Sequence, residues 1–167
     1  MKRHSSMTIL TGCCLALLAL HCNQRQQPAP DTRAADEATI RGFTPAWFKA
    51  YNAGDANSLV ALYAEDAVVN APGAPAAHGH AAIREFLVKD IAASAKAGVT
   101  LNAGPSVDVG VSSDLGWEWG TFTVKGKSGA TVDAGKYVSV FGRKDGKWLI
   151  IRDIWNSDGP IQAPKAK

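Results

Sequence analysis

The sequence has 167 residues, which is enough for one domain with a substantial hydrophobic core. Hydrophobic residues make up 46% of the chain and charged residues 20%, as in a globular protein rather than a disordered one. The formal net charge is only +3, and Lys2 and Arg3 contribute two of those charges. A nearly neutral domain lacks the basic surface that binds a nucleic-acid backbone, so we expect no nucleic-acid partner.

The N-terminal segment, residues 1–22, has the pattern of a secretory signal peptide. Lys2 and Arg3 form a positive start, and the apolar run TILTGCCLALLAL at 8–20 is too short to span a bilayer as a helix. The polar, Gln- and Pro-rich residues 23–36 then indicate a flexible linker. We therefore expect an exported protein of the periplasm or cell envelope.

All three cysteines lie in this first segment, so the exported part has neither a disulfide nor a reactive thiol. Cys22 ends the apolar run and resembles the lipidated cysteine of a bacterial lipoprotein. The preceding residue is His21, where lipoproteins carry a small residue, whereas LTGC at 10–13 fits that pattern but has too short an apolar stretch before it. A lipid on Cys22 would anchor the protein to a membrane; export without an anchor is the alternative.

Apolar residues spaced by three and four predict helices in the next part of the chain. The first helix includes Ile40, Trp47 and Tyr51, and Pro45 either kinks it or lies near its start. The expected helices cover about 35–54, 55–63 and 81–97, and a short strand at 66–70 precedes the third.

After Gly98 the hydrophobic period changes to two, which is typical of strands. Strands are expected at 99–112, 115–126, 130–143 and 147–157, and Asp145-Gly146 is a strong hairpin signal. Three N-terminal helices followed by an antiparallel meander predict an α+β domain over residues 37–160, with the helices packed on one face of a curved sheet. Residues 161–167 form a polar tail.

The order of these elements resembles the cone-shaped folds of the nuclear-transport-factor-2-like superfamily. Residues 51–86 are similar to bacterial ketosteroid isomerases and polyketide-cyclase-like relatives, through Gly54-Asp55, YAEDA at 63–67, a proline loop, and AIREF at 82–86. The ending GKWLIIRDIWNSDGP at 146–160 resembles the branch called SnoaL-like or DUF4440. A curved sheet closed by three helices leaves a cavity at the mouth of the cone, which is a common ligand site. The sequence has no Gly-rich phosphate loop or nucleophile elbow, so we expect no cofactor.

The same resemblance locates three isomerase roles, and this sequence fills none of them. The carboxylate that moves a proton next to a carbonyl corresponds to Ala71, before Pro72. The phenol that holds the enolate oxygen corresponds to Trp47, and the protonated acid beside it to Ser139. We therefore expect no steroid isomerisation.

The register of the family also predicts which strand residues face the cavity. It places Trp117, Trp119 and Thr121 inward from one strand, then residues 137, 139 and 141, and finally residues 151, 153 and 155. Together with a helix residue these give the expected ligand-binding set Trp47, Trp117, Trp119, Ser139 and Trp155. The alternative is that these tryptophans simply form the core.

Asp153 is the candidate catalytic residue, because an acid among large apolar groups has a raised pKa and can carry a proton. The alternative is a salt bridge to Arg41 or Arg84, which would make Asp153 structural. Tyr137 is the second candidate, whereas Glu118 is expected to point away from the cavity, into solvent or a dimer surface.

His78 and His80 would bind a metal only with further ligands nearby, so no metal site is expected. Val138 and Val140 leave an apolar stripe on the outer face of the sheet, which predicts a homodimer.

Two functions remain open. The first is an exported module that binds a small apolar molecule. The second is a small cofactor-independent enzyme of isomerase, cyclase or hydrolase type that uses Asp153 or Tyr137. Whether Asp153 lines a cavity or pairs with an arginine discriminates between them.

Overall fold

The computed structural model describes residues 31–159. The predicted signal peptide, Cys22 and the tail at 161–167 lie outside this range, and residues from Thr32 onward belong to one unit. None of the helices in residues 31–159 is long and apolar enough to cross a membrane. The elements are α1 (Arg33–Arg41), α2 (Phe43–Asn52), α3 (Ala56–Val60), β1 (Tyr63–Asn70), β2 (Ala77–His78), α4 (Gly79–Ala97), β3 (Thr100–Ser112), β4 (Leu115–Lys125), β5 (Thr131–Lys144) and β6 (Lys147–Ser157).

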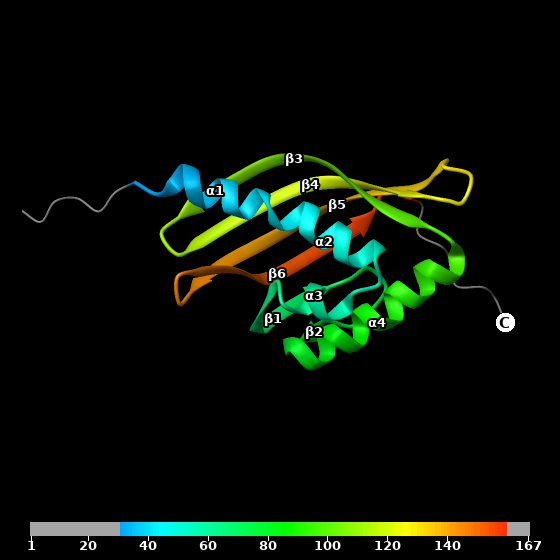
Figure 1. Cartoon of the computed structure of the whole chain (residues 1–167), viewed down its shortest axis with the longest axis horizontal. Coiled ribbons are helices and arrows are strands. Elements are labelled where there is room, and N and C mark those ends of the chain that lie inside the picture. The colour runs from blue at the N-terminus through cyan, green and yellow to red at the C-terminus, as the bar shows by residue number, and fades with distance from the viewer. Residues whose placement is uncertain (1–30, 160–167) are drawn as a thin grey trace, which may run out of the picture. The chain divides into compact units, whose positions relative to one another are not determined.

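Six strands form one sheet in the order β2-β1-β6-β5-β4-β3 (Figure 1). Neighbouring strands are antiparallel except β1 and β6, which run parallel although they come from the two ends of the domain. The four long strands follow the predicted ranges to within one residue at each end. The α+β class is thereby confirmed.

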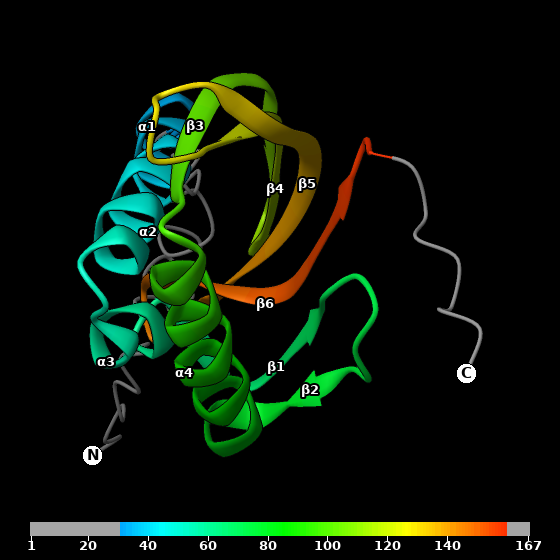
Figure 2. The same cartoon turned by 90° about the vertical axis from the view of Figure 1, so that its right-hand side faces the viewer.

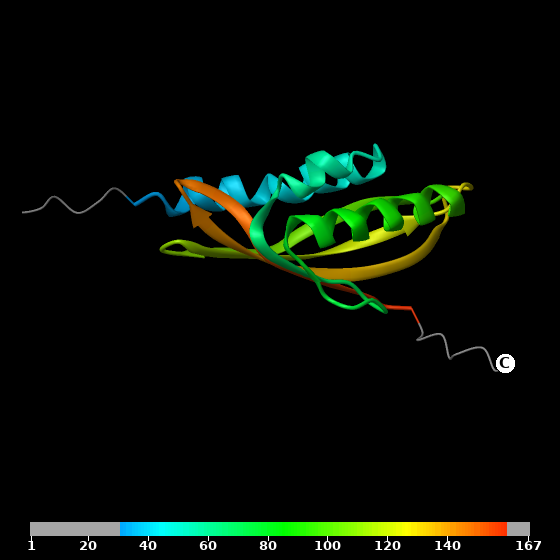
Figure 3. The same ribbon diagram turned by 90° about the horizontal axis from the view of Figure 1, so that it is seen from below.

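The sheet bends strongly, and the helices lie within the bend. Figures 2 and 3 show α2 and α4 on the concave side of the sheet, and no helix of residues 31–159 covers its outer side. The core between the layers contains fully buried side chains from helices and strands alike: Ile40, Leu59, Tyr63, Val69, Ile83, Leu87 and Phe141.

The first expected helix is two helices in the structure. The break falls at Gly42, where an added Cβ would lie 3.1 Å from the carbonyl oxygen of Thr39. Pro45 is the third residue of α2, in the first turn, where its missing N–H leaves no helical bond unmade. The chain therefore bends before the proline rather than at it.

α1 begins at Arg33, inside the segment expected as a linker. Asp36 explains why this part is ordered: its carboxylate accepts hydrogen bonds from the Trp148 indole, at 3.0 Å, and from the Arg143 guanidinium, at 2.5 Å. Arg143 in turn stacks 4.4 Å above the Trp148 ring. These contacts fasten α1 to the β5–β6 hairpin.

The sequence places Tyr63 in a helix, and that placement is wrong. Tyr63 begins β1, pairs with Ile150 of β6 and is 1% exposed. The short helix α3 ends earlier, at Val60, so the chain has two residues of turn before the strand.

A bulge in β6 changes which residues face inward. Val140 pairs with Arg152 and Phe141 with Ile150, so Ile151 is the extra residue. Ile150 and Asp153 are consequently both buried on the concave side. Ile151 was expected there, and Ile150 takes its place.

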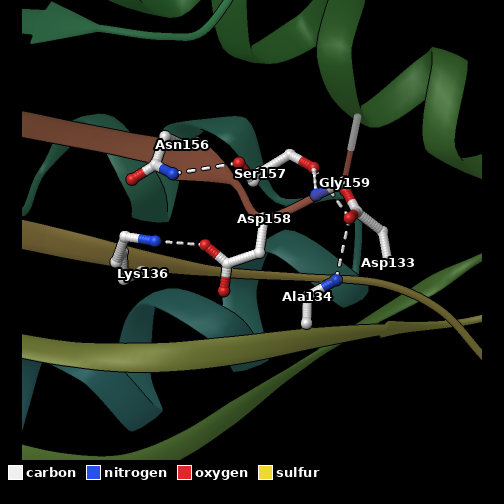
Figure 4. Close-up of polar contacts among 7 residues, drawn as sticks. All are labelled: Asp133, Ala134, Lys136, Asn156, Ser157, Asp158 and Gly159. Carbon is white, nitrogen blue, oxygen red and sulfur yellow. Dashed lines mark hydrogen bonds and ion pairs between the residues drawn. The ribbon is translucent and has the colours of Figure 1, made fainter. Parts of the chain in front are cut away.

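Polar contacts close the end of β6 against β5 (Figure 4). The Ser157 hydroxyl donates to Asp133 Oδ1 at 2.7 Å and accepts from the backbone N–H of Gly159 at 2.9 Å. Lys136 forms an ion pair with Asp158 beside them. Here the structure shows a strand end closed by a turn.

Candidate functional site: an aromatic cavity with two carboxylates

A cavity lies between α2 and the concave face of β3–β6. It holds about 550 Å³, including its solvent-open mouth. Seven of its twelve lining residues are aromatic, and no Lys, Arg or His of the described chain is among them. The lining residues are Phe43, Thr44, Trp47, Phe48, Leu101, Phe122, Tyr137, Ser139, Phe141, Ile150, Asp153 and Trp155.

Asp153 is the one ionisable carboxyl in this lining. It is 6% exposed, and both of its oxygens accept hydrogen bonds: Oδ2 from the Tyr63 hydroxyl at 2.7 Å and Oδ1 from the Ser139 hydroxyl at 2.8 Å. In residues 31–159 no basic side chain forms an ion pair with it, so the expected alternative of a bridge to Arg41 or Arg84 is wrong. Asp153 thus lies in the cavity without a counter-charge from any residue of 31–159.

Trp47 is linked to Asp153 indirectly, through the Tyr63 hydroxyl. Its indole N–H donates to the Tyr63 hydroxyl at 2.8 Å, and that hydroxyl donates to Asp153. The Trp47 ring stacks on Tyr51 with 5.0 Å between centroids. The indole donor is therefore already used within the protein and does not point a free N–H at a ligand.

Burial raises the pKa values of Asp153 and Tyr63. It raises the pKa of the Asp153 carboxyl, while the hydrogen bonds from Tyr63 and Ser139 act in the opposite direction. Burial and the nearby Asp153 charge also raise the pKa of Tyr63 well above its usual value. Tyr63 therefore stays protonated and remains a donor.

A second carboxylate stands behind the cavity wall. Glu118 of β4 is only 1% exposed, which corrects the expectation that it points into solvent. Its Oε1 accepts from the Ser106 hydroxyl at 2.6 Å and its Oε2 from the Thr44 hydroxyl at 2.9 Å. None of the described basic side chains pairs with it either.

Tyr137 connects Glu118 to the cavity. Its hydroxyl lies 2.9 Å from the Thr44 hydroxyl, whose single hydrogen goes to Glu118, so Tyr137 is the donor in this pair. Burial raises the pKa of Tyr137 to about 12, and the charges of Glu118 and Asp153 add to that rise. Tyr137 is neutral at physiological pH.

The donors of the site are nearly all occupied. The hydroxyls of Thr44, Tyr137 and Ser139 and the indole of Trp47 each donate to another protein atom. Among the lining side chains the Trp155 N–H alone lacks a hydrogen-bond partner in residues 31–159. A ligand in this cavity thus meets aromatic faces and acceptor oxygens, with few free donors.

Trp117 and Trp119 do not line this cavity, so their predicted inward placement is wrong. They are 41% and 37% exposed on the outer face, and the neighbouring Thr121 is exposed as well. The inward residues of β4 have the opposite parity: Gly116, Glu118, Gly120 and Phe122.

The two glycines account for this parity. A Cβ on Gly116 would lie 2.4 Å from Cδ1 of Ile40, and a Cβ on Gly120 would lie 2.7 Å from the Tyr137 hydroxyl oxygen. Side chains from α1 and β5 occupy the space that larger residues would need. The concave face of β4 therefore requires small residues at these positions, and the tryptophans face outward.

The remaining predicted residues divide into two groups. Tyr137, Ser139, Asp153, Trp47 and Trp155 all line the cavity, and Phe86 of α4 packs against Trp155 with 5.9 Å between centroids. Ala71 follows β1 but is not among the lining residues.

The two histidines do not form a site. His78 is exposed, and Nε2 of His80 lies 2.9 Å from the Tyr63 carbonyl oxygen. In residues 31–159 no three metal-ligating side chains come together.

Several cavity residues were not predicted. Thr44 and Phe48 are on the inner side of α2, and their spacing of four from each other was an available signal. Tyr63 and Glu118 were missed because one was assigned to a helix and the other to the wrong face.

This geometry defines a class of protein: an α+β domain with an aromatic-lined cavity between its helices and the concave face of a bent sheet. A family model described as the SnoaL-like domain matches residues 45–151, so the chain belongs to the SnoaL-like domain family. Curated protein sequences gave no match.

Solved structures share the fold at low sequence identity. An NTF2-like protein with a cystatin-like fold from Novosphingobium aromaticivorans is 24% identical, with a TM-score of 0.68 over 77% of this chain and 86% of that one. An NTF2-like protein of unknown function from Pseudomonas putida is 18% identical, with a TM-score of 0.69 over 80% and 94%. A ketosteroid isomerase-like protein from Erwinia carotovora atroseptica is 21% identical, with a TM-score of 0.58 over 75% and 98%. These likenesses establish the fold alone.

Proposed function

We propose that this protein is an exported binding protein whose cavity takes up a small, largely apolar molecule. The observation that carries the proposal is the cavity itself, which is open to solvent and lined by seven aromatic residues. Such a concave, mostly apolar site with a few polar groups is the usual form of a small-molecule site. The occupied donors argue against an isomerase role, because an enolate oxygen needs free donors aimed at it.

The test is to identify what the cavity retains. Residues 23–167 are purified without denaturation, and native and denaturing mass spectrometry are compared for a released small molecule. We expect a ligand in the wild type that is lost from Phe122→Ala and Phe141→Ala, since both side chains form the wall. Val88→Ala on the outside of α4 serves as the control. If all variants release the same molecule in the same amount, that molecule is not in the cavity.

A second function is favoured by one specific feature, the location of Asp153. A buried carboxylate that lines a cavity and has no basic partner among residues 31–159 can take a proton from a carbon acid and return it elsewhere on the same molecule. Tyr137 would then face the substrate oxygen, provided that its hydrogen leaves Thr44 for the substrate. This is the chemistry of an isomerase or cyclase without a cofactor.

Enone isomerisation separates the two functions. Wild type, Ala71→Asp and Asp153→Asn are assayed together for movement of a β,γ-enone double bond. We expect the wild type to match the buffer rate, and Ala71→Asp to fall well short of the roughly 10²–10⁴-fold that a positioned base contributes, because Ala71 is outside the cavity lining. Wild-type turnover that disappears in Asp153→Asn would make Asp153 the working acid–base residue.

The proposal includes a homodimer formed through the outer face of the sheet. Trp119 pairs with Val138, and Val138 with Ile154, so three exposed apolar side chains form one row across β4, β5 and β6. Trp117 lies next to this row on β4. A contiguous exposed apolar surface of this kind is typical of an interface.

A further inference from the structure

We infer that the molecule bound in the cavity carries a positive charge: a protonated amine or a quaternary ammonium on an apolar body. This inference rests on the proposed binding function and narrows its ligand. Three features of the described chain carry it.

The first feature is a pair of buried carboxyl groups without a basic partner among residues 31–159. Both oxygens of Asp153, in the lining, and of Glu118, behind it, lie 2.6–2.9 Å from hydroxyl oxygens that can donate to a carboxylate. Burial raises the pKa of Asp153, and a bound cation would favour its charged form. Hydroxyl donors stabilise such charges without neutralising them. Within residues 31–159, no lysine, arginine or histidine nitrogen lies within 4 Å of either group. Buried charges are normally paired, and a cationic ligand would supply the missing partner.

The second feature is the aromatic wall. Phe43, Trp47, Phe48, Phe122, Tyr137, Phe141 and Trp155 surround the space next to Asp153. The face of an aromatic ring carries partial negative charge and attracts a cation, most strongly where water is excluded. A neutral apolar ligand would use the area of these rings but not their electrostatic field.

The third feature is the shortage of donors. The cavity hydroxyls already donate to Glu118, Thr44 and Asp153, so the groups that remain for a ligand are mainly acceptors. An anionic ligand would face Asp153, with Glu118 behind the wall, and would find the Trp155 N–H as the one unoccupied donor in the described lining. The cavity therefore selects against carboxylates and phosphates.

The test uses two probes of nearly the same shape. Phenyltrimethylammonium and tert-butylbenzene differ in charge and hardly in size, and benzoate supplies the anion. Binding to the full chain is measured by titration calorimetry or by quenching of tryptophan fluorescence. We expect the cation to bind about tenfold or more tightly than the neutral probe, and benzoate not to bind.

Substitutions of Asp153 and Glu118 test whether the preference for the cationic probe arises in the cavity. Asp153→Asn keeps the shape and removes the charge, so its preference for the cation should fall to a few-fold while tert-butylbenzene binding changes little. Glu118→Gln should lower the preference by less, because Glu118 is outside the lining. Glu85→Gln, which removes an exposed carboxylate paired with Lys89, should leave all three affinities unchanged.

Three outcomes of these measurements would overturn the inference. Equal binding of the cation and the neutral probe to the wild type would overturn the inference and leave the binding function in place. A cation preference of unchanged size in both Asp153→Asn and Glu118→Gln would show that the cation binds away from these two carboxyl groups, and would also overturn the inference. Failure of both probes, with no ligand retained on purification, would overturn the proposed function and this inference with it.

Discussion

The hydroxyl of Tyr63 donates a 2.7 Å hydrogen bond to Oδ2 of Asp153, a residue 90 positions further along the chain. This bond joins the first strand of the sheet, β1, to the last, β6. The Trp47 indole N–H donates to the same Tyr63 hydroxyl, so Trp47 is linked to Asp153 through Tyr63. The acidic end of the cavity is thus held by a chain of three side chains from α2, β1 and β6.

Tyr63→Phe should remove the central member of this chain. Asp153 then loses a donor and the Trp47 N–H loses its acceptor, so unfolding by urea should show a loss of about 1.5–3 kcal/mol, the range for a buried hydrogen bond to a charged group. Tyr51→Phe is the matched control, because its hydroxyl bonds to Asp90 and Ser94, which are only partly buried. If Tyr63→Phe loses no more unfolding free energy than Tyr51→Phe, the buried hydrogen bonds among Trp47, Tyr63 and Asp153 stabilise the fold no more than a partly buried set does.

Asp36 should make stability depend on acid pH. The Arg143 guanidinium, the Trp148 indole and the Thr32 hydroxyl lower the pKa of Asp36 to about 2 in the folded protein, from an ordinary value of 3.8. The folded pKa is depressed, so the stabilisation is fully present above about pH 4 and is lost as the pH falls through about 2. Thermal unfolding between pH 5 and pH 2 should be less pH-dependent in Asp36→Asn. Asp145→Asn, in the exposed turn before β6, should keep the wild-type profile.

Val138→Lys should convert the proposed dimer into a monomer. Val138 is the middle residue of the apolar row on the outer face, and a charge there would be buried against its own copy in a two-fold interface. Val88→Lys on α4 is a close control, since both valines are 43% exposed. Light scattering after size-exclusion chromatography reports the mass. A wild type that is already monomeric at high concentration would rule out the dimer.

Cys22→Ser should move the protein from the membrane fraction to the soluble periplasmic fraction if a lipid is attached there. Fractionation of cells that express the full chain measures this directly, and mass spectrometry of the mature N-terminus identifies the modification. A wild type found wholly in the soluble fraction, with a processed but unlipidated N-terminus, would retain export and reject the anchor. Cys13→Ser is the control, because Cys13 precedes the expected attachment site.

The sequence predicts the meander well because alternation and turn residues are local. Asp145-Gly146 produces the β5–β6 turn, and both residues have positive φ there. The sequence does not reveal the bulge at Ile151, since the extra residue is fixed by pairing with β5 rather than by its neighbours in the chain. One extra residue is enough to replace Ile151 by Ile150 on the inner face.

The inner face of β4 shows why the site was only partly predictable. The register of the family predicts Trp117 and Trp119 on the inner face. The structure places Gly116 and Gly120 inward because Ile40 and Tyr137 fill the space above them. That information lies in elements distant in sequence. The buried acid Asp153 was recognisable because its apolar neighbours Ile151 and Trp155 flank it on the same strand.

The parallel pairing of β1 with β6 governs when this cavity can form during synthesis. β1 leaves the ribosome early, but its neighbour β6 is the last strand of the domain, so one side of β1 has no partner until nearly the whole domain is made. Pairings between such distant segments are slow to form and leave strand edges exposed in the meantime. Asp153 lies on β6, the last strand to be synthesised, and its hydrogen-bond partner Tyr63 lies on β1, the first strand to be synthesised. A chain that ends before β6 would therefore lack both the centre of its sheet and the acidic end of its cavity, and its unpaired β1 would be prone to associate with other chains.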